Sequence, residues 1–177
     1  MQRPAAGSPP PTFRFRCATC DEVHEGLPAL GFDCPVQYLS VPEDERDART
    51  WLTSETCVID DTHFFVHARL KIPVIGYEDA IDYGVWISLS EKNFTRFEEL
   101  LEEPGREREG PWFGWFCSRL PGYPDTLFLK TNLHLRPVPL RPLVELEPTD
   151  HPLAVDQRNG ISPERAAELV EVALHPR

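Results

Sequence analysis

Three residues near the start of the chain are of the types that bind metal ions or exchange disulfides. They are Cys17, Cys20 and His24, which follow the spacing Cys-x2-Cys-x3-His within FRFRCATCDEVHEGLP. Two cysteines separated by two residues can both reach one ion from a tight turn, so the pair is half of a tetrahedral zinc site. The same pair can instead cycle between dithiol and disulfide, or form two unreactive thiols beside a turn. The sequence leaves these three interpretations open.

A zinc site requires two further ligands besides the cysteine pair. His24 is close enough in the sequence to be the third ligand. The fourth must come from a distant segment, and we expect Cys57, which lies in TSETCVID at the edge of an expected strand, with Cys34 and His63 as alternatives. A second Cys-x2-Cys would be a stronger signal, and the sequence has none. The predicted ligand set is Cys17, Cys20, His24 and Cys57.

The charges around the cysteine pair disfavour redox chemistry. A reactive thiol needs a lowered pKa, which usually comes from a helix N-terminus or from cationic neighbours. Here Asp21, Glu22 and Glu25 follow the pair and raise the pKa of a thiol, whereas Arg14 and Arg16 offset this only in part. Of the other cysteines, the one within WFGWFCSRL is expected to be a small buried hydrophobe.

A second group of polar residues lies near the C-terminal end, in TDHPLAVDQRNG. Asp150 and His151 form a pair that is suited to acid–base catalysis, and Glu145 adds a nearby carboxylate. The alternative is structural, with Thr149 or Asp150 capping a short helix. If the pair is functional, the protein is a small metal-dependent or acid–base hydrolase.

Basic residues follow the polar faces of two expected strands. His67 and Arg69 lie on one strand, and His134 and Arg136 lie on the other. If the two strands are neighbours, these residues form a basic patch that is suited to a small anionic ligand or an acidic segment of a protein partner. The alternative is a solvated sheet face whose charges balance acidic residues elsewhere.

Aromatic residues are concentrated in the stretch PWFGWF. Trp112 and Phe116 are expected on one face of a strand, and Phe113 and Trp115 on the other. One set can fill the core, while an exposed set would mark a surface for a partner or ligand, which makes Trp112 and Trp115 candidate contact residues. Burial on both faces is the alternative.

Composition limits the classes of function. The chain has 177 residues, with 29 acidic and 18 basic ones and a net charge of -11. A negative field of this size repels phosphate backbones, so we expect no nucleic-acid partner. The longest apolar runs are too short for a membrane helix, and the first residues lack the apolar segment of a secretory signal. We therefore expect a cytoplasmic protein, with residues 1–12 forming a disordered proline-rich arm.

Hydrophobic periodicity predicts five strands and two or three helices in one domain over residues 13–177. Alternating apolar residues predict strands at 63–74, 83–90, 111–120, 127–137 and 141–148. Helical spacing predicts a helix over 91–103 with Ser90 as its N-cap, a short helix that ends at Gly160, and a last helix from 163 with Ser162 as its N-cap. Strands followed by helices indicate an α+β fold, in which the C-terminal helix packs on a mostly antiparallel sheet.

Several long segments together resemble a known bacterial family. They are CATCDEVHEGLP, CVIDDTHFFVHARLKIPV, YGVWISLSEKNF, WFGWFCSRLPGYPDTLFLKTNLHLRP and LEPTDHPLAVDQRNGIS. In this order they resemble the family known as domain of unknown function 2199, over Phe13 to His175. The resemblance implies no assigned activity and no catalytic residues. It does imply a Cys-x2-Cys-Gly-x2-His motif, in which Asp21 here replaces the glycine, and aspartate tolerates the left-handed backbone of such a turn.

These observations favour a non-catalytic binding or interaction domain over the hydrolase. We expect its partner to be a protein or a small anionic ligand. We also expect a structural zinc ion that fastens the N-terminal segment to the sheet.

Overall fold

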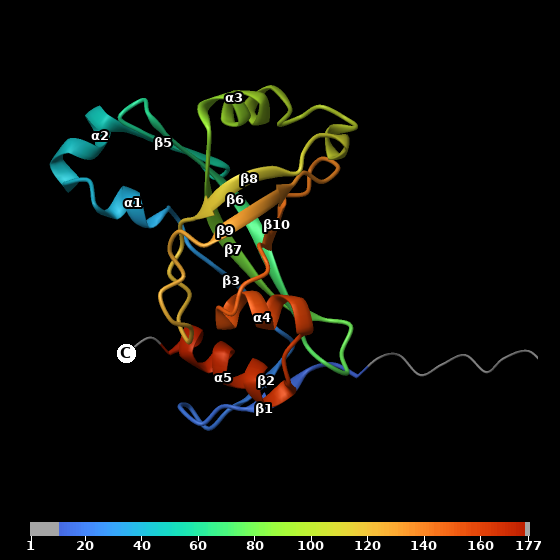
Figure 1. Cartoon of the computed structure of the whole chain (residues 1–177). Helices are drawn as coiled ribbons and strands as arrows, with labels where there is room; N and C mark the ends of the chain where they lie inside the picture. Colours follow the sequence, from blue (N-terminus) through green and yellow to red (C-terminus); the bar gives the residue numbers. More distant parts are fainter. Residues whose placement is uncertain (1–10, 176–177) are drawn as a thin grey trace, which may run out of the picture.

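Two long antiparallel strands run through the molecule in this computed structural model, which describes residues 11–175. β6 (His63–Pro73) and β7 (Ala80–Leu89) pair from one end to the other (Figure 1). The alternation predicted for β6 is confirmed, since Val66, Ala68 and Leu70 are fully buried in the main core. Residues 1–10 of the predicted N-terminal arm lie outside the described residues.

β6 and β7 are also two of the five strands that close into a ring. β8 (Trp112–Phe116), β9 (Lys130–His134) and β10 (Leu143–Leu146) continue from β7 and return to β6. The contacts around the ring are antiparallel except for the parallel pair β10–β6. β8 approaches β7 closely because Gly114 has no side chain: a Cβ there would lie 2.5 Å from Cγ2 of Ile87.

Three short strands extend the ring into an eight-stranded sheet. β5 (Thr56–Ile59) and then β4 (Thr50–Leu52) follow β6, and β3 (Ala29–Gly31) pairs in parallel with β7. The predicted α+β class is confirmed, as is the mostly antiparallel sheet. The sequence did not predict β3 or β4, or the short helices α1 (Val36–Leu39) and α2 (Arg46–Arg49), because segments of three or four residues carry too little periodicity.

Helices cover the sheet at two places. α3 (Glu91–Glu99) lies over one end of the ring, while α4 (Pro152–Asn159) and α5 (Pro163–Leu174) lie at the other end of the β6–β7 pair (Figure 1). The predicted caps are confirmed for α3 and α5, where the Ser90 and Ser162 hydroxyls accept backbone N–H groups. The C-terminal helix packs on the core through Ala166, Leu169 and Val170.

The end of α3 differs from the prediction, and Arg106 explains why. The helix ends at Glu99, earlier than the expected stop at Pro104. Arg106 is only 5% exposed, and its guanidinium donates to the carbonyls of Leu100 and Leu101. The Leu100 carbonyl also accepts the Glu103 N–H at 3.2 Å, whereas the Leu101 carbonyl accepts from Arg106 at 2.8 Å, so the arginine supplies a donor that a continued turn would have supplied. Burial lowers the pKa of Arg106.

The buried side chains form a main core and a smaller second core. The main core occupies one face of β6 and β7 and receives the C-terminal helices. The second core comprises Val41, Cys57, Ile59, Phe65, Trp86 and Cys117. The Trp86 indole N–H donates to the carbonyl of Phe32 at 2.8 Å, so it is satisfied inside this cluster. In the described part of the chain, no helix combines the length and the apolar composition needed to cross a membrane.

Candidate metal centre

A small hairpin presents the first two cysteines and the histidine. β1 (Arg14–Arg16) and β2 (Val23–Glu25) are antiparallel, with Phe15 opposite His24. The connecting turn is closed by two backbone hydrogen bonds, from Cys17 N–H to the Glu22 carbonyl at 2.8 Å and from Asp21 N–H to the Cys17 carbonyl at 3.0 Å. The turn therefore holds the residues of the Cys-x2-Cys-x3-His motif on a short, fixed backbone.

The backbone of Asp21 adopts the left-handed conformation expected from the sequence. Its φ is 59°, a value at which glycine is free of strain and aspartate is among the better tolerated residues. The Asp21 side chain also bonds Arg16, with 2.7 Å between the carboxylate and a guanidinium nitrogen. An aspartate can therefore close the turn where a glycine is expected.

Four candidate ligand atoms converge beside this hairpin. One atom from each of Cys17, Cys20, His24 and His175 lies within 4.8 Å of the other three. The Cys20 Sγ and the His24 Nε2 are already 3.3 Å apart, and the His24 and His175 ring centres are 6.4 Å apart. A zinc ion with bonds of about 2.0–2.3 Å separates its ligands by roughly 3.3–3.8 Å, so a contraction of about 1 Å closes the site. The cluster is compatible with a metal site.

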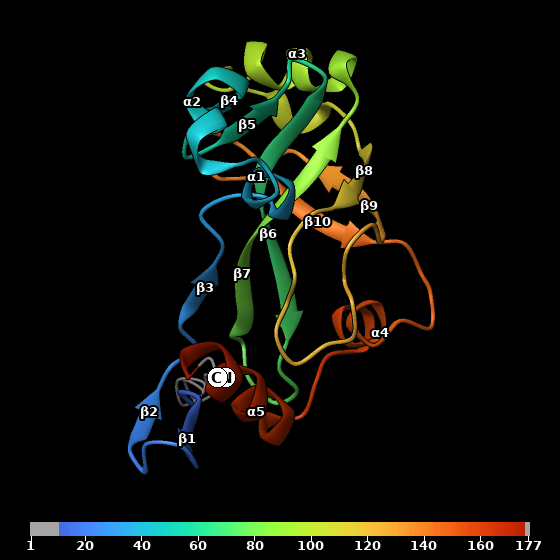
Figure 2. The same ribbon diagram turned by 90° about the vertical axis from the view of Figure 1, so that its left-hand side faces the viewer.

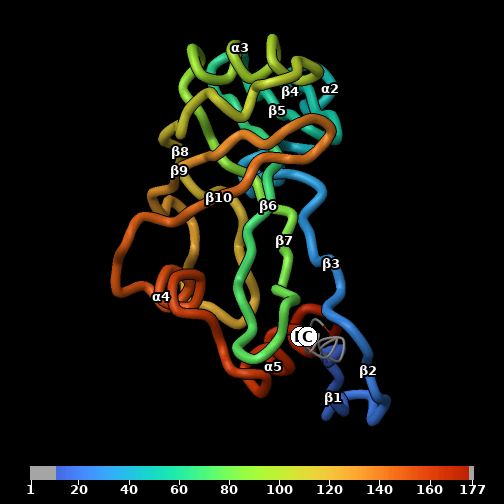
Figure 3. The backbone as a smooth tube through the Cα atoms, turned by 90° about the vertical axis from the view of Figure 1, so that its right-hand side faces the viewer, coloured from blue at the N-terminus to red at the C-terminus, as the bar shows by residue number. Residues whose placement is uncertain are grey.

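The fourth residue, His175, comes from the opposite end of the chain. It directly follows α5, and Figures 2 and 3 show that helix lying beside the β1–β2 hairpin. Glu171 connects the two segments, because its carboxylate accepts the Ala18 N–H at 2.6 Å and its carbonyl accepts the His175 N–H at 2.9 Å. The His175 Nε2 is buried and has no hydrogen-bond partner among the described residues. A buried nitrogen of this kind needs a partner, and a metal ion beside two thiols would supply one.

The hairpin is also held by apolar contacts. Phe13, just before β1, is 1% exposed and meets Tyr77 edge-on with 5.3 Å between ring centres. Phe15 stacks on His24 at 5.3 Å. Packing therefore positions the hairpin and orients one of the candidate imidazole ligands.

Cys57 does not join this cluster, which corrects the predicted ligand set. It lies on β5, at the opposite end of the molecule (Figure 1), and is fully buried in the second core. Burial raises the pKa of Cys57 to about 12, so the thiol stays protonated. The two alternatives, Cys34 and His63, also lie outside the cluster. Sequence spacing could not identify His175, because only the packing of α5 brings it to the hairpin.

The environment of the cysteine pair does not favour redox activity. A backbone hydrogen bond at Glu22 lowers the pKa of Cys20, but desolvation and the neighbouring Cys17 thiol outweigh it, and the net shift is upward. Reactive dithiols have lowered pKa values instead.

His151 of the predicted Asp150/His151 pair serves as a helix cap in this structure. His151 is the N-cap of α4, where its Nδ1 accepts the Leu153 N–H at 3.2 Å, and its Nε2 lies 3.2 Å from the Asp125 carbonyl. The predicted caps, Thr149 and Asp150, are therefore corrected to His151. Because both ring nitrogens are engaged, neither is available to take a proton from a substrate in this arrangement.

Glu145 is likewise engaged rather than directed at His151. Its carboxylate lies 2.9 Å from Nε2 of His134 across the β9–β10 pair. Of the predicted hydrolase site, His151 therefore caps a helix and Glu145 belongs to a cross-strand pair.

The predicted basic patch is divided by an intervening strand. β10 lies between β6, which carries His67 and Arg69, and β9, which carries His134. Arg69 pairs with Asp82 at 2.8 Å, and Arg136 donates to a backbone carbonyl at 2.5 Å. The condition for the patch, that the two strands are neighbours, is therefore not met, and these cations have partners within the chain.

His67 of β6 is half-buried, and its imidazole is neutral. Its Nδ1 lies 2.9 Å from the Ser54 carbonyl and its ring stacks on Trp86 at 4.8 Å. Burial lowers the pKa of His67. The residue therefore adds no positive charge to a patch at neutral pH.

The aromatic residues of β8 separate by face, as the alternation predicts. Phe116 is fully buried and Trp112 is half-buried against the main core. On the other face, Phe113 and Trp115 are exposed and meet edge-on with 5.0 Å between ring centres. Of the two predicted contact residues, Trp115 is thus the one on the open face.

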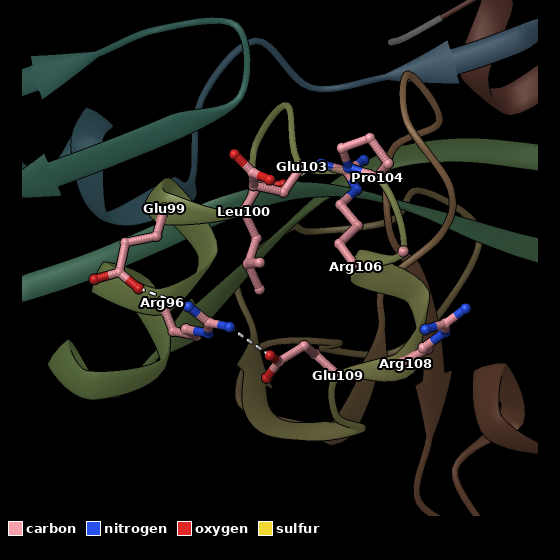
Figure 4. A pocket seen from close by; sticks show the side chains of 9 residues that line it. Arg96, Glu99, Leu100, Glu103, Pro104, Arg106, Arg108 and Glu109 are labelled. Atoms are coloured by element: carbon pink, nitrogen blue, oxygen red, sulfur yellow. Dashed lines mark hydrogen bonds and ion pairs between the residues drawn. The ribbon is translucent and has the colours of Figure 1, made fainter.

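A charged groove beside α3 has a volume of about 520 Å³ (Figure 4). Arg96 crosses it and pairs with Glu99 at 2.9 Å and Glu109 at 2.6 Å, while Arg106 turns inward to backbone carbonyls. These arginines are already engaged with groups of the same chain, and the groove is open to water. Exposed pairs of this kind contribute little individually, so we assign the groove no ligand.

Comparison with protein families places the chain in one of them. Residues 16–161 match the model of a family described as an uncharacterized protein conserved in bacteria, DUF2199. The chain belongs to this family. The matched range contains Cys17, Cys20 and His24 but ends before His175. No curated protein and no solved structure matches the chain.

Proposed function

We propose that this member of the DUF2199 family is a non-catalytic binding domain of the bacterial cytoplasm, whose two terminal segments are fastened together by a structural zinc ion. The ligands are Cys17, Cys20, His24 and His175. The observation that carries the metal site is the buried Nε2 of His175, which has no hydrogen-bond partner within residues 11–175 and lies beside two thiols and a second imidazole.

The donor set supports zinc as the metal. Two thiolates and two imidazoles suit zinc, which takes four such ligands in a tetrahedron. Four protein ligands also fill the coordination sphere and leave no open position for water or substrate, which supports a structural role rather than a catalytic one.

The contacts around the site support its role as a fastener. The hairpin is short, and its direct polar link to α5 is the bond from Ala18 to Glu171. An ion bound by three hairpin residues and one residue after α5 would add the strongest connection between these segments. Binding energy of this kind contributes directly to folding stability.

The metal content of the purified protein tests this proposal. Tag-free protein, prepared without chelators, is analysed by elemental mass spectrometry beside the variants Cys17→Ser/Cys20→Ser and His175→Ala. We expect about one zinc per chain in the wild type, none in the double variant, and at least tenfold weaker retention in His175→Ala. Cys57→Ala is the matched control, since it removes a thiol elsewhere and should retain the metal. Wild-type protein without metal, or a double variant that retains it, would contradict the proposal.

A further inference from the structure

An apolar cavity of about 340 Å³ lies at the other end of the molecule from the metal centre. It is bounded by α1, by the ends of β6 and β7, by β8 and by the loop that carries Phe128. Part of its wall is the second core, through Phe65 and Cys117. The volume is in the range of pockets that hold small molecules.

The lining of this cavity favours a neutral ligand, since it has no carboxylate, ammonium or guanidinium group and its imidazole, His63, has Nδ1 3.0 Å from the Thr62 hydroxyl. None of its ten lining residues is Asp, Glu, Lys or Arg, although such residues make up 27% of the chain. The groove beside α3, by contrast, is lined mainly by arginines and glutamates. A cation in the apolar cavity would lose hydration without gaining a counter-charge, and an anion could gain only the imidazole of His63, so an ionised ligand is unfavourable. The lining therefore fits a neutral molecule.

One polar atom at the cavity needs a partner. The Nε2 of Gln37 lies 3.4 Å from the Cys117 Sγ, and the Cys117 thiol donates to the Trp115 carbonyl at 3.3 Å. Because the thiol hydrogen is used there, the sulfur accepts from the Gln37 amide, and this fixes which end of the amide faces it. The Gln37 Oε1 is then buried with no hydrogen-bond partner in the described part of the chain. An unsatisfied buried acceptor costs about 1–3 kcal/mol. The oxygen has almost no accessible surface, so a ligand N–H or O–H would relieve this cost only after a rotation of the Gln37 side chain exposes it to the cavity.

Aromatic side chains stand at the rim of the cavity. Trp115 is 40% exposed and Phe128 is 60% exposed. Phe128 has a φ of 60°, an unfavourable left-handed backbone for a bulky residue, and its N–H is held by the Phe116 carbonyl at 2.8 Å. Strained residues of this kind persist where the surrounding structure enforces them, and they gather at binding sites. Their exposed rings offer faces and edges for stacking.

We propose that this cavity binds a small neutral aromatic molecule that carries one N–H or O–H donor, with its ring against Trp115 and Phe128 and its donor bonded to the Gln37 Oε1 once the Gln37 side chain turns that oxygen toward the cavity. This names a ligand class for the binding role proposed above and rests on that role. It differs from the anionic ligand expected from the sequence, because Arg69, His134 and Arg136 of the expected patch already have partners within the chain.

Titration of the isotope-labelled full chain with indole tests the proposal. Indole is neutral and has one N–H donor, whereas 1-methylindole has the same ring without the donor. We expect saturable amide shifts confined to the residues that line the cavity, and intermolecular nuclear Overhauser effects between indole and the Trp115 side chain in the wild-type protein. We also expect indole to bind about tenfold more tightly than 1-methylindole.

Two variants and a control sharpen the test. Trp115→Ala should weaken indole binding at least tenfold, whereas Trp51→Ala, which removes a more exposed tryptophan on β4, should leave it unchanged. Gln37→Leu should abolish the preference for indole over 1-methylindole. Absence of saturable binding, shifts outside the cavity, equal effects of the two tryptophan variants, or an undiminished preference in Gln37→Leu would overturn the proposal. All these proteins should keep their zinc, so a failure here is distinct from a failure of the metal site.

Discussion

Two regions of the molecule carry cysteines in pairs, and their surroundings differ completely. Cys17 and Cys20 lie in a hairpin turn with two imidazoles beside them. Cys57 and Cys117 lie in the second core, among aromatic and aliphatic side chains. The residue type is the same, but only the first pair has further ligands within reach. The comparison teaches that the neighbours of a thiol, and not its presence, decide whether it can hold a metal.

Burial in the second core makes the two thiols unreactive, and it lets them contribute to the stability of the fold. It raises the pKa of Cys57 to about 12 and that of Cys117 to about 11, so both thiols remain protonated and apolar at neutral pH. As small hydrophobes they contribute to packing and not to catalysis.

The largest expected effect is the loss of stability when zinc is removed from the site at the β1–β2 hairpin. Removal of zinc by a chelator should lower the free energy of unfolding by about 4 kcal/mol relative to protein in free zinc a thousandfold above the dissociation constant. Hydrogen exchange should become faster in residues 13–25 and at the end of α5, but not in β5. Exchange that is unchanged at the hairpin, or equally faster in β5, would show that the ion does not fasten these segments.

A smaller loss of stability is expected from Cys57→Ser in the second core. The substitution places a hydroxyl in an apolar cluster, which should cost about 1–3 kcal/mol. Denaturant unfolding measures this loss, and elemental analysis should still find one zinc per chain. Loss of the metal in this variant would erase the distinction between the two thiol regions.

The stability of the protein should also fall at alkaline pH. Cys57 and Cys117 have raised pKa values in the folded state, while a thiol in the unfolded chain ionises near about 8.5. Stability is therefore complete below about pH 8.5 and declines as the pH rises toward about 11, where only the unfolded chain is ionised at these residues. At pH 9.5 the loss is about 1.4 kcal/mol for each thiol.

Urea unfolding at pH 7.5 and pH 9.5 measures this difference. A Cys57→Val/Cys117→Val variant should lose most of the dependence. A variant that keeps the full dependence would assign it to other groups, such as Tyr83, whose pKa burial raises to about 12.

The smallest effect is expected at the hairpin turn. Asp21→Gly should stabilise the protein by about 0.5–1 kcal/mol, because glycine adopts the left-handed φ of 59° without strain. Asp21→Ala is the control, since it keeps the strain and removes the exposed pair with Arg16. Thermal unfolding should rank the glycine variant above the wild type and the alanine variant below it. Any other order would mean that the Arg16 pair, and not the backbone, dominates at this position.

Long periodic segments made much of the fold predictable. The alternation around Val66 and Leu70 identified β6, and serine caps at Ser90 and Ser162 identified the starts of α3 and α5. Patterns of this length reflect one buried face, so they survive in any tertiary arrangement. The closure of the ring was not predictable, because strand order depends on pairings between distant segments such as β10 and β6.

Three of the candidate metal ligands could be identified from spacing alone, since Cys17, Cys20 and His24 share one turn whose geometry is local. The sequence also determined the α+β class and the amphipathic last helix. Only the tertiary structure decided the fourth ligand, because His175 reaches the hairpin through the packing of α5, and Cys57 is withdrawn by its place in the second core. The tertiary arrangement likewise pairs Arg69 with Asp82 and forms an apolar cavity beside Trp115. Local spacing constrains a turn, whereas long-range packing constrains which distant side chains meet.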